Sequence, residues 1–248
     1  MVVALGVIGV VLMAAPESPR FTRLSVQDGL SQSSVQQILQ DRKGLLWFGT
    51  QEGLNRYDGY RFTVHRARAQ PGFLGDHDIN ALIEDTGGDL WVGTSRGLYR
   101  YDLATGRFDG CASPVDSLEI IKLVRSGDGR IFFAVSDGRL WVLDPADPKR
   151  RARALNDGAF AALNSVAALA PGRGPAIWAA ARGRLFKVDT QQAEPSAQLT
   201  EALADLGTVS VLATDPRGDV WIGGLNGDLL RYRPAGGEVT RFPQAPHG

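Results

Sequence analysis

The chain has 248 residues with 27 basic and 27 acidic side chains, so its formal net charge is zero and its pI lies near 6.8. This balance gives no electrostatic basis for binding nucleic acid, and we expect no nucleic-acid partner. The only cysteine, Cys111, excludes an intramolecular disulfide, and we interpret it as an inert small residue.

The N-terminal segment, residues 1–15, is apolar and uncharged. It is short for a bilayer span and precedes Pro16, so we interpret it as an export signal, with a buried first strand as the alternative. Residues 21–26 alternate like a strand ahead of the first repeat. We expect them to be a closing strand, the outermost strand of another blade in a ring of sheets.

One stretch recurs three times, over residues 41–58, 85–102 and 215–232. In each copy an aspartate lies six residues before a tryptophan and a glycine lies six residues after it, which identifies a repeat protein. The shared positions are Asp41, Gly44, Trp47 and Gly53; Asp85, Gly88, Trp91 and Gly97; and Asp215, Gly218, Trp221 and Gly227. Two weaker copies place Phe132 and Trp178 at the aromatic position.

The first copy divides into four short strands, at residues 35–40, 45–50, 54–57 and 60–65, separated by turn residues. Four antiparallel strands in each repeat of about 40–45 residues are typical of a β-propeller blade. The sequence therefore predicts an all-β fold, with a propeller domain over residues 16–248. We place its five blades near residues 35–65, 79–108, 120–144, 166–189 and 209–242, as an incomplete ring.

Both recurring side chains have a structural explanation. We expect the aromatic residue to fill the wedge between neighbouring blades rather than to offer a stacking platform for sugars. The repeated acids could be mistaken for paired catalytic carboxylates, but each occupies the same turn, so we expect them to accept backbone hydrogen bonds. These acids are Asp41, Asp85, Asp128 and Asp215.

The first blade closely resembles the opening of the two-component regulator propeller family. The likeness rests on Asp28-Gly29-Leu30-Ser31, on Trp47-Phe48-Gly49-Thr50 and on the run from Gly53 to Gly59. It extends through the second blade, weakens in the third and fourth, and returns in the fifth. The resemblance implies a ring of about seven blades in the extracytoplasmic part of a receptor. Such a receptor carries a histidine kinase or a diguanylate cyclase beyond a transmembrane helix, and this chain contains neither output motif.

No catalytic, cofactor or metal site is predicted. The three histidines, His65, His77 and His247, fall in unrelated repeat phases and lack the spacing of zinc ligands. Asp76-His77-Asp78 is the one local cluster with acid–base character, and we interpret it as a solvated turn.

A candidate ligand face follows from strand order, because turns alternate between the two faces of a propeller. The turns after the second strands and the loops that enter the inner strands share one face, which we call the loop face. Its candidate ligand-binding residues are Gln32, Ser33, Gln51, Glu52, His77, Asp78, Ser95 and Arg96.

The leading functional hypothesis is a periplasmic, non-catalytic sensor or interaction propeller, the N-terminal part of a receptor anchored in the inner membrane. Its expected partners are a small molecule or oligosaccharide, further blades and receptor domains, and a dimer partner. One alternative is a propeller enzyme, similar to streptogramin lyase or to a glycosidase. The other is a structural interaction module that associates through an open blade edge.

Overall fold

A computed structural model describes residues 21–111, 114–155, 163, 165–189, 196–199 and 203–243. The predicted export signal, residues 1–15, and His247 lie outside these ranges. Within them, no helix has the length and apolar character needed to cross a membrane.

The described chain forms five antiparallel sheets of four strands, each with its strands in chain order, so the predicted all-β fold is confirmed. Blade one contains β1 (Val35–Gln40), β2 (Leu46–Thr50), β3 (Gly53–Tyr57) and β4 (Phe62–His65). Blade two contains β5 (Ile79–Glu84), β6 (Leu90–Thr94), β7 (Gly97–Asp102) and β8 (Arg107–Gly110). Blade three contains β9 (Ile120–Arg125), β10 (Ile131–Val135), β11 (Leu140–Leu143) and β12 (Arg153–Leu155).

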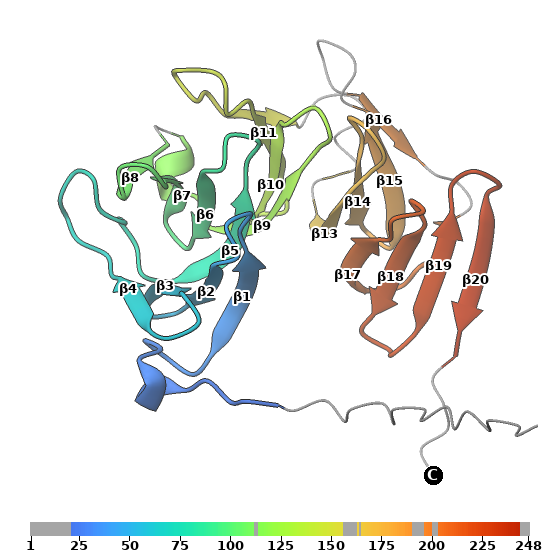
Figure 1. The fold of residues 1–248 in the computed structure, drawn as a ribbon. Coiled ribbons are helices and arrows are strands. Elements are labelled where there is room, and N and C mark those ends of the chain that lie inside the picture. Colours follow the sequence, from blue (N-terminus) through green and yellow to red (C-terminus); the bar gives the residue numbers. More distant parts are fainter. Residues whose placement is uncertain are drawn as a thin grey trace, which may run out of the picture.

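Blade four contains β13 (Val166–Pro171), β14 (Ile177–Ala181), β15 (Arg184–Asp189) and β16 (Ser196–Leu199). Blade five contains β17 (Val209–Thr214), β18 (Val220–Gly224), β19 (Leu229–Arg233) and β20 (Glu238–Phe242). Each inner strand contacts the inner strand of the next blade, from β1 through β5, β9 and β13 to β17. The blades thus follow an arc, with the blue blade one and the red blade five at its two ends (Figure 1).

Three expectations about element bounds need correction. The sheets of blades three and four do not end near residues 144 and 189, because β12 and β16 add a fourth strand to each. The predicted closing strand at residues 21–26 is wrong as local structure: residues 21–25 carry no strand, and Val26–Asp28 is a short 3-10 helix, η1. Ser25 and Asp28 cap η1 reciprocally, and this capping stabilises a turn. The structure describes no neighbouring strand with which residues 21–26 could pair.

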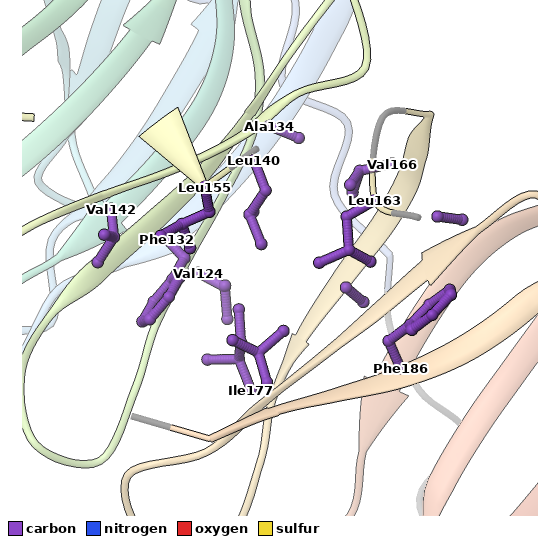
Figure 2. Packing of buried hydrophobic residues seen from close by; sticks show 13 residues of the cluster. Val124, Phe132, Ala134, Leu140, Val142, Leu155, Leu163, Val166, Ile177 and Phe186 are labelled. Carbon is purple, nitrogen blue, oxygen red and sulfur yellow. The ribbon is translucent and has the colours of Figure 1, made fainter. Parts of the chain in front are cut away.

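The hydrophobic core lies between blades rather than inside any one sheet. Figure 2 shows the wedge between blades three and four, where Phe132 and Leu155 of one sheet face Ile177 and Phe186 of the next. Similar clusters fill the wedges between blades one and two, two and three, and four and five. Because a single sheet cannot bury its own faces, the stacking of neighbours creates the core.

The recurring aromatic residue occupies these wedges, as the sequence predicts. Trp47, Trp91 and Phe132 are fully buried, and Trp178 is buried against blade five. Trp221 of blade five is the exception, because it is only half-buried and stacks on Phe242 of its own sheet, with ring centroids 5.5 Å apart. No described blade follows blade five to cover this indole.

Candidate functional site

The repeated aspartates are structural. In blade one, Asp41 Oδ1 accepts the backbone N–H groups of Lys43 and Leu45, each at 2.9 Å. This is the predicted backbone role, and it holds the turn closed. The other oxygen, Oδ2, accepts the indole Nε1–H of Trp47 at 2.9 Å, a contact that we did not predict. One carboxylate therefore fixes both the turn and the core side chain.

The same indole contact recurs in two other blades. Trp91 donates to Asp85 at 2.9 Å, and Trp221 donates to Asp215 at 3.3 Å. Asp128 is wrongly grouped with these acids, because the residue six positions before Phe132 is Ser126. A phenyl ring carries no N–H donor, so the indole contact has no counterpart in blade three. These acids thus serve separate blades and form no catalytic pair.

The predicted loop face brings its polar residues together in pairs. Gln32 Nε2 donates to Gln51 Oε1 at 3.3 Å in blade one. In blade two, the Ser95 hydroxyl donates to an Asp78 carboxylate oxygen at 2.7 Å, and the Ser95 N–H donates to the Asp78 carbonyl at 3.2 Å. Each pair joins the loop before an inner strand to the turn after the second strand, which is the arrangement that strand counting predicts.

The other predicted residues of this face lie at the surface or in the turns. Ser33 and Glu52 are exposed, and the Glu52 N–H donates to Thr50 Oγ1 at 3.1 Å. The Arg96 N–H donates to the Thr94 hydroxyl at 3.0 Å. Among the described residues, no hydrogen bond joins the blade-one pair to the blade-two pair, so the face consists of two separate polar clusters.

The Asp76–His77 segment has one buried and one exposed side chain. Asp76 is buried, and its Oδ2 has no hydrogen-bond partner in the described structure, whereas the side chain of His77 is 61% exposed. The two side chains approach to 3.8 Å. Burial, followed by the nearby charges of Asp76 and Asp116, raises the pKa of the Tyr99 hydroxyl. The segment combines a solvated imidazole with a buried carboxylate beneath it.

Sequence reasoning missed a cavity on the loop face. A cavity of about 470 Å³ opens between blades four and five, lined by Ser165, Arg182, Asp205, Gly207 and Thr208 among others. Arg182 lies four residues after Trp178, in the repeat position that Gln51 and Ser95 occupy in their own blades. That repeat phase is the signal that could have identified it.

Two residues of this cavity have an unusual backbone. Arg182 has a φ of 50° and Asp205 has a φ of 62°, which is the left-handed region that non-glycine residues rarely adopt. Such conformations cost free energy and gather at sites where a loop must hold a fixed shape. Both side chains are charged and belong to loops, so the cavity joins the loop face as a candidate ligand site.

Chemistry beyond binding has little support in the described residues. They contain no group of three or more His, Cys, Asp or Glu side chains placed to hold a metal ion. Cys111 is buried, and this burial raises the pKa of its thiol to about 11, so it is not a thiolate at neutral pH. This agrees with its interpretation as an inert residue.

Comparison with known proteins finds a family match for part of the chain and a shared fold. Residues 29–52 and 74–96 match the two-component regulator propeller family. A 39-residue stretch, 16% of this chain, is 59% identical to histidine kinase P4 of Formosa agariphila, of which it covers 3%. The chain therefore spans a very small part of this curated relative.

Solved structures of low sequence identity share the fold. The extracellular domain of a hybrid two-component system from B. thetaiotaomicron matches with a TM-score of 0.68 at 22% identity, over 88% of this chain and 31% of that one. Virginiamycin B lyase from Staphylococcus aureus matches with a TM-score of 0.65 at 14% identity, over 85% of this chain and 69% of that one. The chain thus carries two-component regulator propeller repeats in its first two blades, within a β-propeller fold.

Proposed function

We propose that this chain is a ligand-sensing and interaction propeller of the extracytoplasmic part of a two-component or diguanylate cyclase receptor, and that it performs no catalysis. The observation that carries the proposal is the coincidence of two findings. Two-component regulator repeats form blades one and two, and the fold matches the extracellular domain of a hybrid two-component system. In this proposal the chain is exported, and the receptor's membrane anchor and output domain lie outside these 248 residues.

The loop face is the proposed ligand site. Its side chains are polar, they stand on loops held by a rigid stack of sheets, and the cavity beside Arg182 lies on the same face. Paired hydroxyl, amide and carboxylate groups such as Gln32–Gln51 and Asp78–Ser95 suit a ligand with many hydroxyl groups. We propose an oligosaccharide as the ligand class.

The proposal is tested by calorimetric titration of the purified chain with neutral and acidic oligosaccharides. We expect the triple variant Gln51→Ala, His77→Ala, Arg96→Ala to weaken binding without lowering the melting temperature. The single variant Arg182→Ala separates the blade-four cavity from the blade-one and blade-two clusters. Asp144→Ala, at an exposed turn, is the matched control. Affinity unchanged in both loop-face variants would remove this face as the site.

A propeller enzyme is the second candidate, and virginiamycin B lyase is the neighbour that favours it. A solved structure of that lyase, with quinupristin, carries a histidine-to-alanine change that makes it catalytically inactive. In the described part of this chain, His65 lies in an outer strand and His77 at the surface of a loop. The test is to incubate quinupristin with this chain and to follow its concentration by chromatography. We expect no loss of quinupristin. Turnover that His77→Ala abolishes would overturn the non-catalytic assignment.

A further inference from the structure

The loop that follows β4 is hydrogen-bonded to the outermost strand of blade two, at the outer edge of the blades. The Arg68 N–H donates to the Leu74 carbonyl at 2.8 Å, and the Leu74 side chain is fully buried. Gly72 forms an isolated antiparallel bridge with Phe108 of β8, whose N–H donates to the Gly72 carbonyl at 3.1 Å. The loop therefore connects the outermost strands of blades one and two, which are labelled β4 and β8 in Figure 1.

A cavity of about 220 Å³ lies beneath this loop. It is lined by the end of β4, the loop itself and the start of β8, including His65, Arg66, Arg68, Phe73, Arg107 and Phe108. A Cβ placed on Gly72 would lie 2.7 Å from a guanidinium nitrogen of Arg107, so glycine leaves room for that side chain over the loop. We call this cavity the rim pocket.

Three arginines line the rim pocket without an ion-pair partner among the described residues. Arg66, Arg68 and Arg107 form no ion pair with any described carboxylate. Arg68 instead lies over the ring of Phe73, 4.7 Å from its centroid. The nearest acids along β8 and β7 have other partners: Asp109 pairs with Arg150 at 3.4 Å, and Asp102 accepts the N–H groups of residues 104 and 105. The pocket is thus cationic and uncompensated.

An unpartnered imidazole lines the same pocket. His65 Nε2 is buried and has no hydrogen-bond partner in the described structure. The ring is held by aromatic neighbours, with centroids 5.9 Å from Trp47 and 5.6 Å from Phe108. A buried polar atom without a partner is costly, and His65 is one of the residues that line the pocket.

We propose that the rim pocket binds the anionic group of a small ligand, a carboxylate or a sulfate. Arginine presents several N–H donors in a planar fork that matches such oxyanions. The volume is below the range of about 300–1,000 Å³ that drug-sized ligands occupy, so a ligand of monosaccharide size fits, such as a sugar acid. The rim pocket is separate from the loop face and stands whether or not that face binds a ligand.

The test uses glucuronate and inorganic sulfate as probes, with glucose and chloride as their controls, all at constant ionic strength. We expect glucuronate or sulfate to bind in calorimetric titration and to shift the His65 ring signals in NMR spectra, and glucose and chloride to do neither. Sulfate binding alone would indicate a tetrahedral oxyanion, and glucuronate binding alone a sugar acid. Either outcome supports an anion site, and binding of neither probe would overturn it.

Variants place the binding at this pocket. The double variant Arg68→Gln, Arg107→Gln should weaken anion binding by about ten- to a hundredfold, because it removes two charge-assisted contacts. Arg241→Gln, which changes an exposed arginine on β20 of blade five, is the matched control. If the double variant unfolds more easily, Arg107→Lys carries the test, since it keeps the charge but loses the fork. Unchanged affinity in the folded variants would overturn the proposal.

Discussion

At the scale of single residues, each turn aspartate combines two tasks that the sequence shows only as one repeated letter. Asp85 is buried, and its two oxygens accept the N–H of Asp89 at 3.0 Å and the indole N–H of Trp91 at 2.9 Å. Blade three carries Ser126 and Phe132 at the same two positions, whereas blade four keeps the indole of Trp178 with Gly172 six residues before it, so an indole can occur without the acid. In blade two both side chains are present and buried, and this contact couples Asp85 to Trp91.

This coupling predicts a non-additive pair of substitutions. Asp85→Ser should lower the free energy of unfolding by about 2–3 kcal/mol, because it leaves a buried indole N–H without a partner. In the background of Trp91→Phe the same change should cost at least about 1 kcal/mol less. Urea unfolding of the four proteins measures the difference, and simple additivity would show that the contact has no energetic weight.

His65 predicts a pH dependence of stability. Burial, with a smaller contribution from the nearby Arg56 charge, lowers the pKa of its imidazole from 6.5 to about 4. The imidazole of the unfolded chain therefore takes up a proton as the pH falls below 6.5. In the folded chain the same imidazole stays neutral until the pH is about 4. The stabilisation is complete above pH 6.5 and is lost as the pH falls through this window. We expect about 2 kcal/mol less unfolding free energy at pH 5 than at pH 7.

The check is urea unfolding at both pH values with the variant His65→Phe. Phenylalanine keeps an aromatic ring among Trp47, Tyr101 and Phe108 but cannot take up a proton. Its stability should therefore change much less between pH 7 and pH 5 than that of the unaltered chain. An equal loss in both proteins would assign the effect to other groups.

At the scale of elements, a small residue two positions after the aromatic allows the next blade to approach. A Cβ on Gly49 would lie 2.7 Å from Ile79 of β5, and a Cβ on Gly93 would lie 2.7 Å from Ile120 of β9. Blade five carries Gly223 at this position, where the close side chain among the described residues is Val211 of its own sheet. The first residues of β5 and β9 thus pack against the preceding blade.

This geometry predicts that replacing the glycine by alanine costs more folding free energy in blade two than in blade five. Gly93→Ala should destabilise the fold by about 1–3 kcal/mol, because the added methyl group meets the buried Ile120. Gly223→Ala should cost less than about 1 kcal/mol, because the side chain of Val211 is 55% exposed and can turn away. Neither glycine has a positive φ, so backbone strain does not enter. Equal melting temperatures for the two variants would contradict the inter-blade contact.

Much of the architecture could be predicted from sequence because the repeat itself encodes it. The aromatic, the turn glycine and the alternating strands gave the four strands of blade one nearly residue by residue. The outer strands β12 and β16 were missed because they have only three and four residues and carry no aromatic residue. An outer strand is defined by the neighbour that it pairs with, and a single sequence does not state that pairing.

The candidate sites also include one that the sequence predicts and one that it does not. Strand counting predicted which turns share the loop face, and the Gln32–Gln51 and Asp78–Ser95 contacts agree with it. The rim pocket could not be predicted, because it joins the end of one blade to the outer strand of the next across a loop of no regular structure. Its unpaired charges become visible only when their neighbours in space are known.

At the scale of the whole molecule, the two ends of the arc have exposed apolar side chains at positions that interior blades bury, as far as the structure describes the chain. Ile38 of β1 is 57% exposed, whereas the corresponding Leu82 of β5 is buried. At the other end, Val211, Val239 and Phe242 of blade five are exposed. These are the surfaces on which the neighbouring blades of a longer arc would pack.

The open ends predict that the 248-residue chain associates with itself. An apolar blade face left in water should pair with a complementary face, so blade one of one molecule should pack on blade five of another. Sedimentation velocity should therefore show a concentration-dependent increase in mass.

The double variant Ile38→Lys, Val211→Lys should reduce this association without altering the circular dichroism spectrum, because both side chains already face solvent. Lys122→Glu, on β9 of the interior blade three, changes an exposed charge away from both ends and is the control. A stable monomer at every concentration would show that the open faces are not adhesive, and it would contradict the incomplete-ring interpretation.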